Sequence, residues 1–67
     1  MKMYIKGFIR ISEIHHGEIL INVNDIVFIK SREDKGVKIK VKDRDLYFDT
    51  FQGMVEVVAL IEAAQKE

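Results

Sequence analysis

The chain contains no cysteine, no proline and no tryptophan, and its 67 residues carry no net charge. Without cysteine it forms neither a disulfide framework nor a thiolate metal site. No apolar run approaches the roughly 20 residues that a membrane-spanning helix needs, and the first residues lack the apolar core of a signal peptide. We therefore expect a single small domain over residues 1–67, without membrane insertion and located in the cytoplasm.

The balanced total charge conceals an uneven distribution along the chain. Residues 30–48 contain seven Lys or Arg against four Asp or Glu, whereas residues 49–67 contain one Lys against four Asp or Glu. The middle of the chain is thus mildly basic and its C-terminal part mildly acidic. Zero total charge is not typical of a dedicated nucleic-acid-binding protein, although a local basic face is compatible with it.

Isoleucine, valine and aromatic residues are frequent in the first 49 residues, which predicts a series of short antiparallel strands over residues 8–49. Glycine, asparagine and charged residues at 15–18, 22–25 and 32–36 separate these strands as turns and loops. The expected strands are 8–14, 18–21, 26–31, 37–42 and 45–49, and residues 1–7 form an N-terminal extension.

The segment 37–49 predicts a hairpin whose register is fixed by two patterns. Val, Ile and Val at 37, 39 and 41 alternate with lysines at 38, 40 and 42. One register places apolar residues opposite apolar residues on the inner face and Lys opposite Asp on the outer face. The expected pairs are Ile39–Phe48, Val41–Leu46, Lys38–Asp49 and Lys42–Asp45.

Residues 50–66 predict a helix with its N-cap at Asp49 or Thr50. Met54, Val57, Val58 and Ile61 follow the spacing of a core-facing helical stripe. The predicted fold class is α+β: a small twisted antiparallel sheet of four to five strands, open or curled as a partial barrel, with one C-terminal helix. The predicted common core is Ile39, Val41, Phe48, Val57, Val58 and Ile61.

Four consecutive apolar residues, Ile26 to Ile29, interrupt the alternation in the third expected strand. Neighbouring side chains in a strand point to opposite faces, so either Ile26 and Phe28 or Val27 and Ile29 face away from the single helix. That pair lacks cover unless the sheet curls over it or another subunit covers it. We expect a homodimer that buries the sheet face around Val27 and Ile29.

Few residues combine in a way that indicates catalysis or a cofactor. His15 and His16, flanked by Glu13 and Glu18, are compatible with a weak metal site, but we favour an exposed polar turn because structural metal sites gather ligands from separated elements. No nucleophile lies next to a base in the sequence, and the four glycines form no phosphate-binding loop. We therefore expect no enzyme activity, no metal and no cofactor.

The lysine-rich hairpin has two interpretations. Its cations could follow phosphates while Tyr47, on the same face, stacks on a base. Alternatively, exposed lysines protect a strand against aggregation, and Asp45 and Asp49 offset their charge. We favour the second interpretation and do not expect a nucleic acid as partner. The residues concerned are Lys38, Lys40, Lys42, Arg44 and Tyr47.

The order of several short motifs resembles that of the small FlbD-like proteins, which are linked to flagellar or swarming motility, and of related short proteins of bacteria and phages. The motifs are His16-Gly17, Ile21-Asn22, the runs 25–29 and 36–41, and a helix from Thr50 with Glu56-Val57. This chain departs from the pattern in its residues 1–7, its longer 31–36 loop and the absence of glycine at Asp43-Arg44. The resemblance implies a non-catalytic accessory or protein-interaction module with a protein partner, and it implies no catalytic residues.

A second resemblance concerns the run 26–29, the basic hairpin and the helix. Together they are similar to the last part of LytTR-type DNA-binding domains, of which this chain would supply about half. This resemblance implies the alternative function, nucleic-acid binding through the basic 38–44 hairpin.

Overall fold

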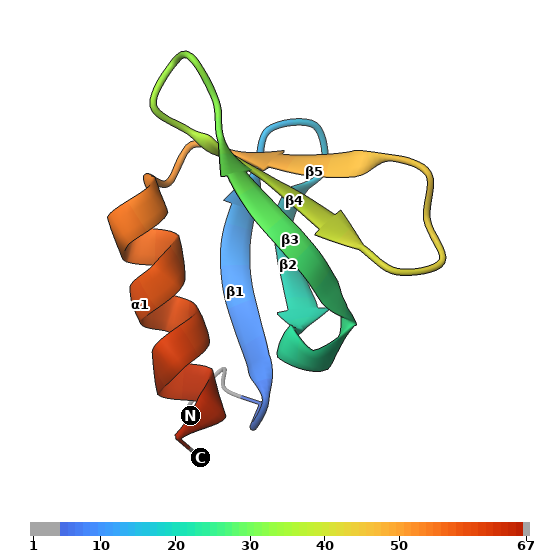
Figure 1. Ribbon diagram of the computed structural model, residues 1–67, viewed down its shortest axis with the longest axis vertical. Coiled ribbons are helices and arrows are strands. Elements are labelled where there is room, and N and C mark those ends of the chain that lie inside the picture. The colour runs from blue at the N-terminus through green and yellow to red at the C-terminus, as the bar shows by residue number, and fades with distance from the viewer. Residues whose placement is uncertain (1–4, 67) are drawn as a thin grey trace.

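The computed structural model describes residues 5–66, which form five antiparallel strands followed by one C-terminal helix (Figure 1). This architecture confirms the predicted α+β class. Residues 1–4 of the expected N-terminal extension lie outside the described residues. The elements are β1 (Phe8–Glu13), β2 (Gly17–Asn22), a 3-10 helix η1 (Val23–Asp25), β3 (Ile26–Ser31), β4 (Val37–Val41), β5 (Tyr47–Thr50) and α1 (Met54–Gln65).

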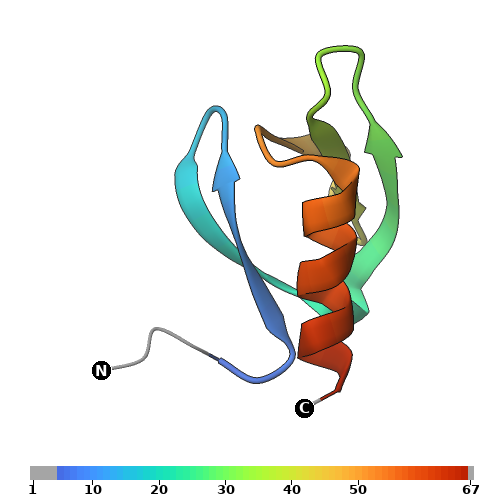
Figure 2. The same ribbon diagram turned by 90° about the vertical axis from the view of Figure 1, so that its left-hand side faces the viewer.

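The five strands form one sheet in the order β2-β1-β5-β4-β3, and the sheet does not close into a barrel. It is strongly bent: the β1–β2 hairpin forms one wall, β3 and β4 form the other, and α1 lies in front of the space between them (Figure 2). The two walls are joined through β5, which pairs with β1 only at Glu13 and Thr50. Both β2 and β3 are edge strands.

The predicted register of the β4–β5 hairpin is confirmed at Ile39–Phe48 and Lys38–Asp49. The expected pairs Val41–Leu46 and Lys42–Asp45 were wrong, because β5 begins only at Tyr47 and Asp43 takes a left-handed backbone conformation with φ 67°. The chain therefore leaves the sheet after β4. Val41 pairs with Ile26 of β3 instead, and Lys42 Nζ lies 3.7 Å from Asp25 Oδ1.

A β-bulge in β3 changes which side chains of the apolar run face inward. The pairing with β4 shifts between Ile26 and Phe28, so one extra residue is accommodated in β3. Ile26 and Ile29 consequently pack against the core, whereas Val27 and Phe28 are 58% and 43% exposed. The expected strict alternation, with Val27 and Ile29 on one face, was wrong for this reason.

The helix begins at Met54 with Gly53 as its N-cap, and no side chain caps it. The expected caps were wrong because Asp49 and Thr50 remain in β5, where they pair with β4. The core-facing stripe is centred on Val57 and Ala64, two turns apart on the same side of the helix. Val58 lies about 100° from Val57 around the helix axis and is 37% exposed, so its predicted burial was wrong.

The core fills the inside of the bend and takes its buried apolar residues from β1, β2, β4 and the helix. Phe48 and Ile61, both predicted core residues, are partly buried and pack against it. Ile39, Val41 and Val57 are buried as predicted. The buried apolar residues are Ile9, Ile11, Ile21, Val37, Ile39, Val41, Val57 and Ala64.

Candidate functional site

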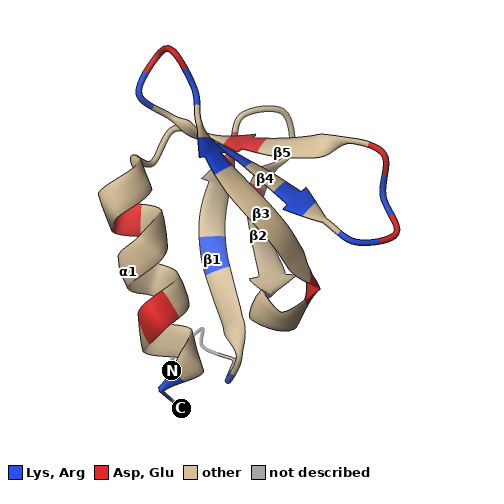
Figure 3. Ribbon diagram, in the orientation of Figure 1, with Lys and Arg blue, Asp and Glu red and all other residues tan. Residues whose placement is uncertain are grey.

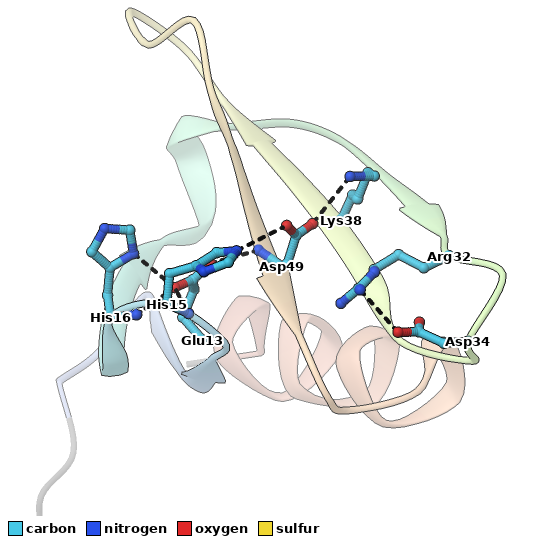
Figure 4. Close-up of polar contacts among 7 residues, drawn as sticks. All are labelled: Glu13, His15, His16, Arg32, Asp34, Lys38 and Asp49. Carbon is cyan, nitrogen blue, oxygen red and sulfur yellow. Dashed lines mark hydrogen bonds and ion pairs between the residues drawn. The ribbon is translucent and has the colours of Figure 1, made fainter.

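Glu13 is a fully buried carboxylate at the seam between β1 and β5 (Figure 4). Its Oε1 accepts hydrogen bonds from the backbone N–H groups of His15 and His16 and contacts His16 Nδ1, each at 2.7 Å. Its Oε2 accepts a hydrogen bond from the Asp49 N–H at 2.8 Å. One side chain thus holds the β1–β2 turn in place and attaches it to β5.

These hydrogen bonds keep Glu13 ionised inside the protein. Burial alone would raise the pKa of its carboxyl group, because it disfavours the charged form. Hydrogen bonds outweigh this effect and lower the pKa of Glu13 from 4.5 to about 2. They come from the N–H of Asp49, the His16 side chain and the N–H groups of His15 and His16. We interpret Glu13 as a structural group that stabilises the seam.

The histidines of the turn occupy separate environments. His16 contacts Glu13 and packs edge-on against Phe48 at a ring-centroid distance of 6.2 Å, whereas His15 Nε2 lies 3.9 Å from Asp49 Oδ2. Glu18, the other expected neighbour, pairs with Arg10 at 2.9 Å. Within residues 5–66, no group of three or more His, Cys, Asp or Glu is arranged to hold a metal ion.

Sequence reasoning treated Glu13 only as a flanking acid and missed its role. A signal was present, because Glu13 continues the period-two inward face of Ile9 and Ile11 in the first strand. A charged residue at an inward position of a strand indicates a buried and hydrogen-bonded group. The acceptor role itself depends on Asp49, 36 residues away, and no local pattern predicts that contact.

The outward surface of β3, β4 and β5 carries exposed apolar and basic side chains together. We call this surface the outer sheet face. Phe28, Lys40 and Tyr47 lie side by side across the three strands, and the Phe28 and Tyr47 ring centroids are 5.9 Å apart. Figure 3 shows the Lys positions along β3 and β4, an acidic position on β5 and the acidic positions on α1. The outer sheet face consists of Val27, Phe28, Lys30, Lys38, Lys40, Tyr47 and Asp49.

Most cations of the predicted polyanion contact have partners within the chain. Lys38 Nζ lies 3.3 Å from Asp49 Oδ1 and 5.5 Å from the centre of the Tyr47 ring. Lys40 Nζ donates to the carbonyl group of Arg44, and Lys42 is paired with Asp25. The structure therefore brings Lys38, Lys40 and Tyr47 together on the outer sheet face, but Lys42 and Arg44 lie elsewhere, along a cleft.

This cleft, of about 530 Å³, lies between β2 and the β4–β5 hairpin. None of its lining residues belongs to α1 or to the outer sheet face, and in Figure 1 the helix and the β4–β5 loop lie at opposite sides of the sheet. Apolar side chains form much of its wall, and polar groups complete it. The apolar lining comprises Phe8, Ile19, Leu20, Ile21, Val41, Leu46 and Phe48; the polar lining comprises His16, Asn22, Asp25, Lys42 and Arg44.

Two sets of contacts fix the backbone at the basic end of the cleft. The backbone N–H of Lys42 donates to the Asp25 carbonyl at 2.9 Å, and the two side chains pair alongside. In addition, the Lys40 side chain donates a hydrogen bond to the Arg44 carbonyl group in the β4–β5 loop. The Arg44 guanidinium, flanked in the chain by Asp43 and Asp45, makes no ion pair with another side chain of residues 5–66 and is the unpaired cation of the cleft.

A further exposed apolar surface lies on the helix and just before it. We call it the helix stripe, and it consists of Phe51, Val55 and Val58. Val55 is 85% exposed, and Glu56 and Glu62 are the acidic positions of the same helix.

No helix within residues 5–66 is long and apolar enough to cross a membrane. Comparison of the chain with protein families, curated proteins and solved structures gives no match. The similarity to FlbD-like proteins and to LytTR-type domains therefore stays a prediction from the sequence.

Proposed function

We propose that the chain is a small non-catalytic protein-interaction module that forms a homodimer through its outer sheet face. The observation that carries this proposal is the β-bulge of β3, which turns Val27 and Phe28 outward together. Together with Tyr47, these side chains form contiguous exposed apolar surface, which is typical of association sites.

The surroundings of this pair support a second copy of the chain as its occupant. Phe28 packs against Tyr47, so the apolar surface extends across the sheet to β5. The surface adjoins the edge strand β3, whose outer backbone groups are unpaired within the sheet. A small domain has a limited core, and a two-fold dimer is the commonest way to bury further apolar surface.

The charges of the outer sheet face determine how such a dimer responds to salt. Lys30 makes no ion pair within residues 5–66, and Lys38 and Lys40 lie beside it, so two copies facing each other bring lysines together. Salt screens that repulsion and leaves the apolar contact intact. Dimerisation is therefore expected to be maintained or strengthened as salt rises.

Sedimentation velocity over the micromolar range tests the proposal. The wild-type protein is expected to shift from monomer to dimer with concentration, and the double variant Val27→Thr/Phe28→Thr is expected to remain monomeric. Val55→Thr is the matched control, because it removes an even more exposed apolar side chain from the helix stripe and should leave the dimer unchanged. A wild-type protein that is monomeric throughout, or a dimer lost only in Val55→Thr, contradicts the proposal.

Nucleic-acid binding is the second candidate, favoured by one observation: two aromatic rings flank Lys40 across the outer sheet face. It is less well supported, because Lys38, Lys40 and Lys42 all have acceptors within the chain. A mobility-shift assay with unrelated DNA and RNA at two salt concentrations distinguishes the functions. Tight binding that weakens steeply with salt and is lost in Lys38→Gln/Lys40→Gln would favour nucleic acid over self-association.

The biological setting is part of the proposal and follows the sequence resemblance. We propose an accessory role in the cytoplasm of a bacterium, or of one infected by a phage, as implied by the similarity to FlbD-like proteins. The dimer would then present its remaining surfaces to a protein partner. Sedimentation tests the dimer independently of this setting.

A further inference from the structure

The cleft between β2 and the β4–β5 hairpin combines an apolar wall with a cation, Arg44, that makes no ion pair within residues 5–66. Its volume, about 530 Å³, is within the range of roughly 300–1,000 Å³ that small-molecule sites occupy. Ile21 and Val41 lie at its floor as core residues, 5% and 6% exposed, whereas Leu20 and Leu46, 46% and 49% exposed, supply open apolar surface. No residue of the helix lines the cleft.

We propose that this cleft binds a small organic acid with an apolar body, of the acyl or aryl carboxylate class. The apolar body lies against Leu20, Leu46 and Phe48, and the carboxylate pairs with the Arg44 guanidinium. This site is separate from the outer sheet face, with which it shares no residue.

The charges along the cleft select an anion with one charged end. Lys42 is already paired with Asp25, so a ligand meets Arg44 as the single available cation. A guanidinium presents two parallel N–H groups that match a carboxylate. A polyphosphate or nucleic acid would leave the apolar wall unused and would place charge beside Asp25. A cationic ligand would meet Arg44, whose like charge repels it.

His16 gives the cleft a second polar contact. Its Nδ1 lies 2.7 Å from Glu13, whose ionised carboxylate can only accept a hydrogen bond, so Nε2 is the nitrogen left for other partners. The ring is held edge-on against Phe48, which also lines the cleft. His16 therefore has a fixed orientation at the wall, where it offers a polar contact to the ligand head group.

Titration of the ¹⁵N-labelled full chain with sodium decanoate, followed by amide chemical shifts, tests the proposal. The matched probe is decyltrimethylammonium, which has the same chain and the opposite charge. Decanoate, kept below its micelle threshold, is expected to give saturable shifts at 19–22 and 41–48. The cation is expected to give weaker shifts there.

Arg44→Gln tests the assigned carboxylate partner, and Lys30→Gln is its control because it removes one exposed cation outside the cleft. Arg44→Gln is expected to weaken decanoate binding on the order of tenfold, as for loss of one charge-assisted pair, whereas Lys30→Gln leaves it unchanged. The fold of each variant is checked by its own amide spectrum. The proposal would be overturned if both variants lost decanoate affinity equally or if the two probes bound equally well. It would also be overturned by chemical shift changes centred on the helix stripe, or by shift changes that do not saturate.

Discussion

The carboxylate of Glu13 accepts a hydrogen bond from the backbone N–H of Asp49 at 2.8 Å, across the seam between β1 and β5. Regular pairing between these strands is limited to Glu13 and Thr50. Nearby, the Gln52 side chain accepts from the Ser12 N–H at 3.1 Å, and Ile14 N–H donates to the Asp49 carbonyl at 2.7 Å. Side chains thus supply several of the bonds that hold the two walls of the bent sheet together.

Glu13→Gln is expected to change how stability depends on pH. The folded-state pKa of Glu13 is lowered from 4.5 to about 2, so its contribution is fully present above pH 4.5 and is lost as pH falls towards 2. The variant lacks this contribution, so its unfolding free energy should fall less than that of the wild type over this range. At neutral pH we expect a loss of roughly 1–3 kcal/mol, because an amide cannot satisfy all four donors.

Urea unfolding at a series of pH values measures this difference, and Glu18→Gln is the matched control. Glu18 is exposed and pairs only with Arg10, so its removal should cost about 0–1 kcal/mol. Parallel pH profiles for the wild type and Glu13→Gln would show that the buried carboxylate does not stabilise the seam in the way described.

Val57 and Val58 are expected to respond very differently to truncation, although they are neighbours of the same type. Val57 is fully buried, and Val57→Ala should cost about 1.5–3 kcal/mol by loss of its buried methyl groups. Val58 is 37% exposed, and Val58→Ala should cost roughly 0.5 kcal/mol or less. Urea midpoints at unchanged m-value provide the comparison, and the reverse order would mean that the side of α1 that carries Val58 faces the core.

Gly36 is expected to be intolerant of any side chain, because a Cβ atom there would collide with the Thr50 carbonyl oxygen. Gly36→Ala should therefore destabilise the protein by roughly 1–3 kcal/mol through forced separation of the 32–36 loop from β5. Gly53 is the control, since a Cβ at Gly53 would meet its nearest neighbour at an ordinary 3.7 Å. Thermal unfolding of both variants checks this, and equal melting temperatures would be inconsistent with the close approach at Gly36.

The sequence predicted the β4–β5 register because apolar and charged alternation agreed at Ile39–Phe48 and Lys38–Asp49. It did not predict the bulge in β3, since no glycine or other local signal marks a position where pairing with β4 shifts. It also placed Val58 inside, because the apolar residues of α1 cover more of its circumference than the core contacts. Arg44 was grouped with Lys38 and Lys40 in the less favoured polyanion interpretation, but the 42–46 loop places it along the cleft.

The proposed interface is tested most directly by intermolecular nuclear Overhauser effects in a sample that mixes isotope-labelled and unlabelled chains. We expect contacts from the Val27 methyl groups and the Phe28 ring of one copy to the Val27, Phe28 or Tyr47 side chains of the other. These contacts should persist at high salt. Self-association through the outer sheet face would be contradicted by intermolecular contacts confined to Phe51, Val55 and Val58. It would also be contradicted if no intermolecular contacts appeared at concentrations where sedimentation shows a dimer.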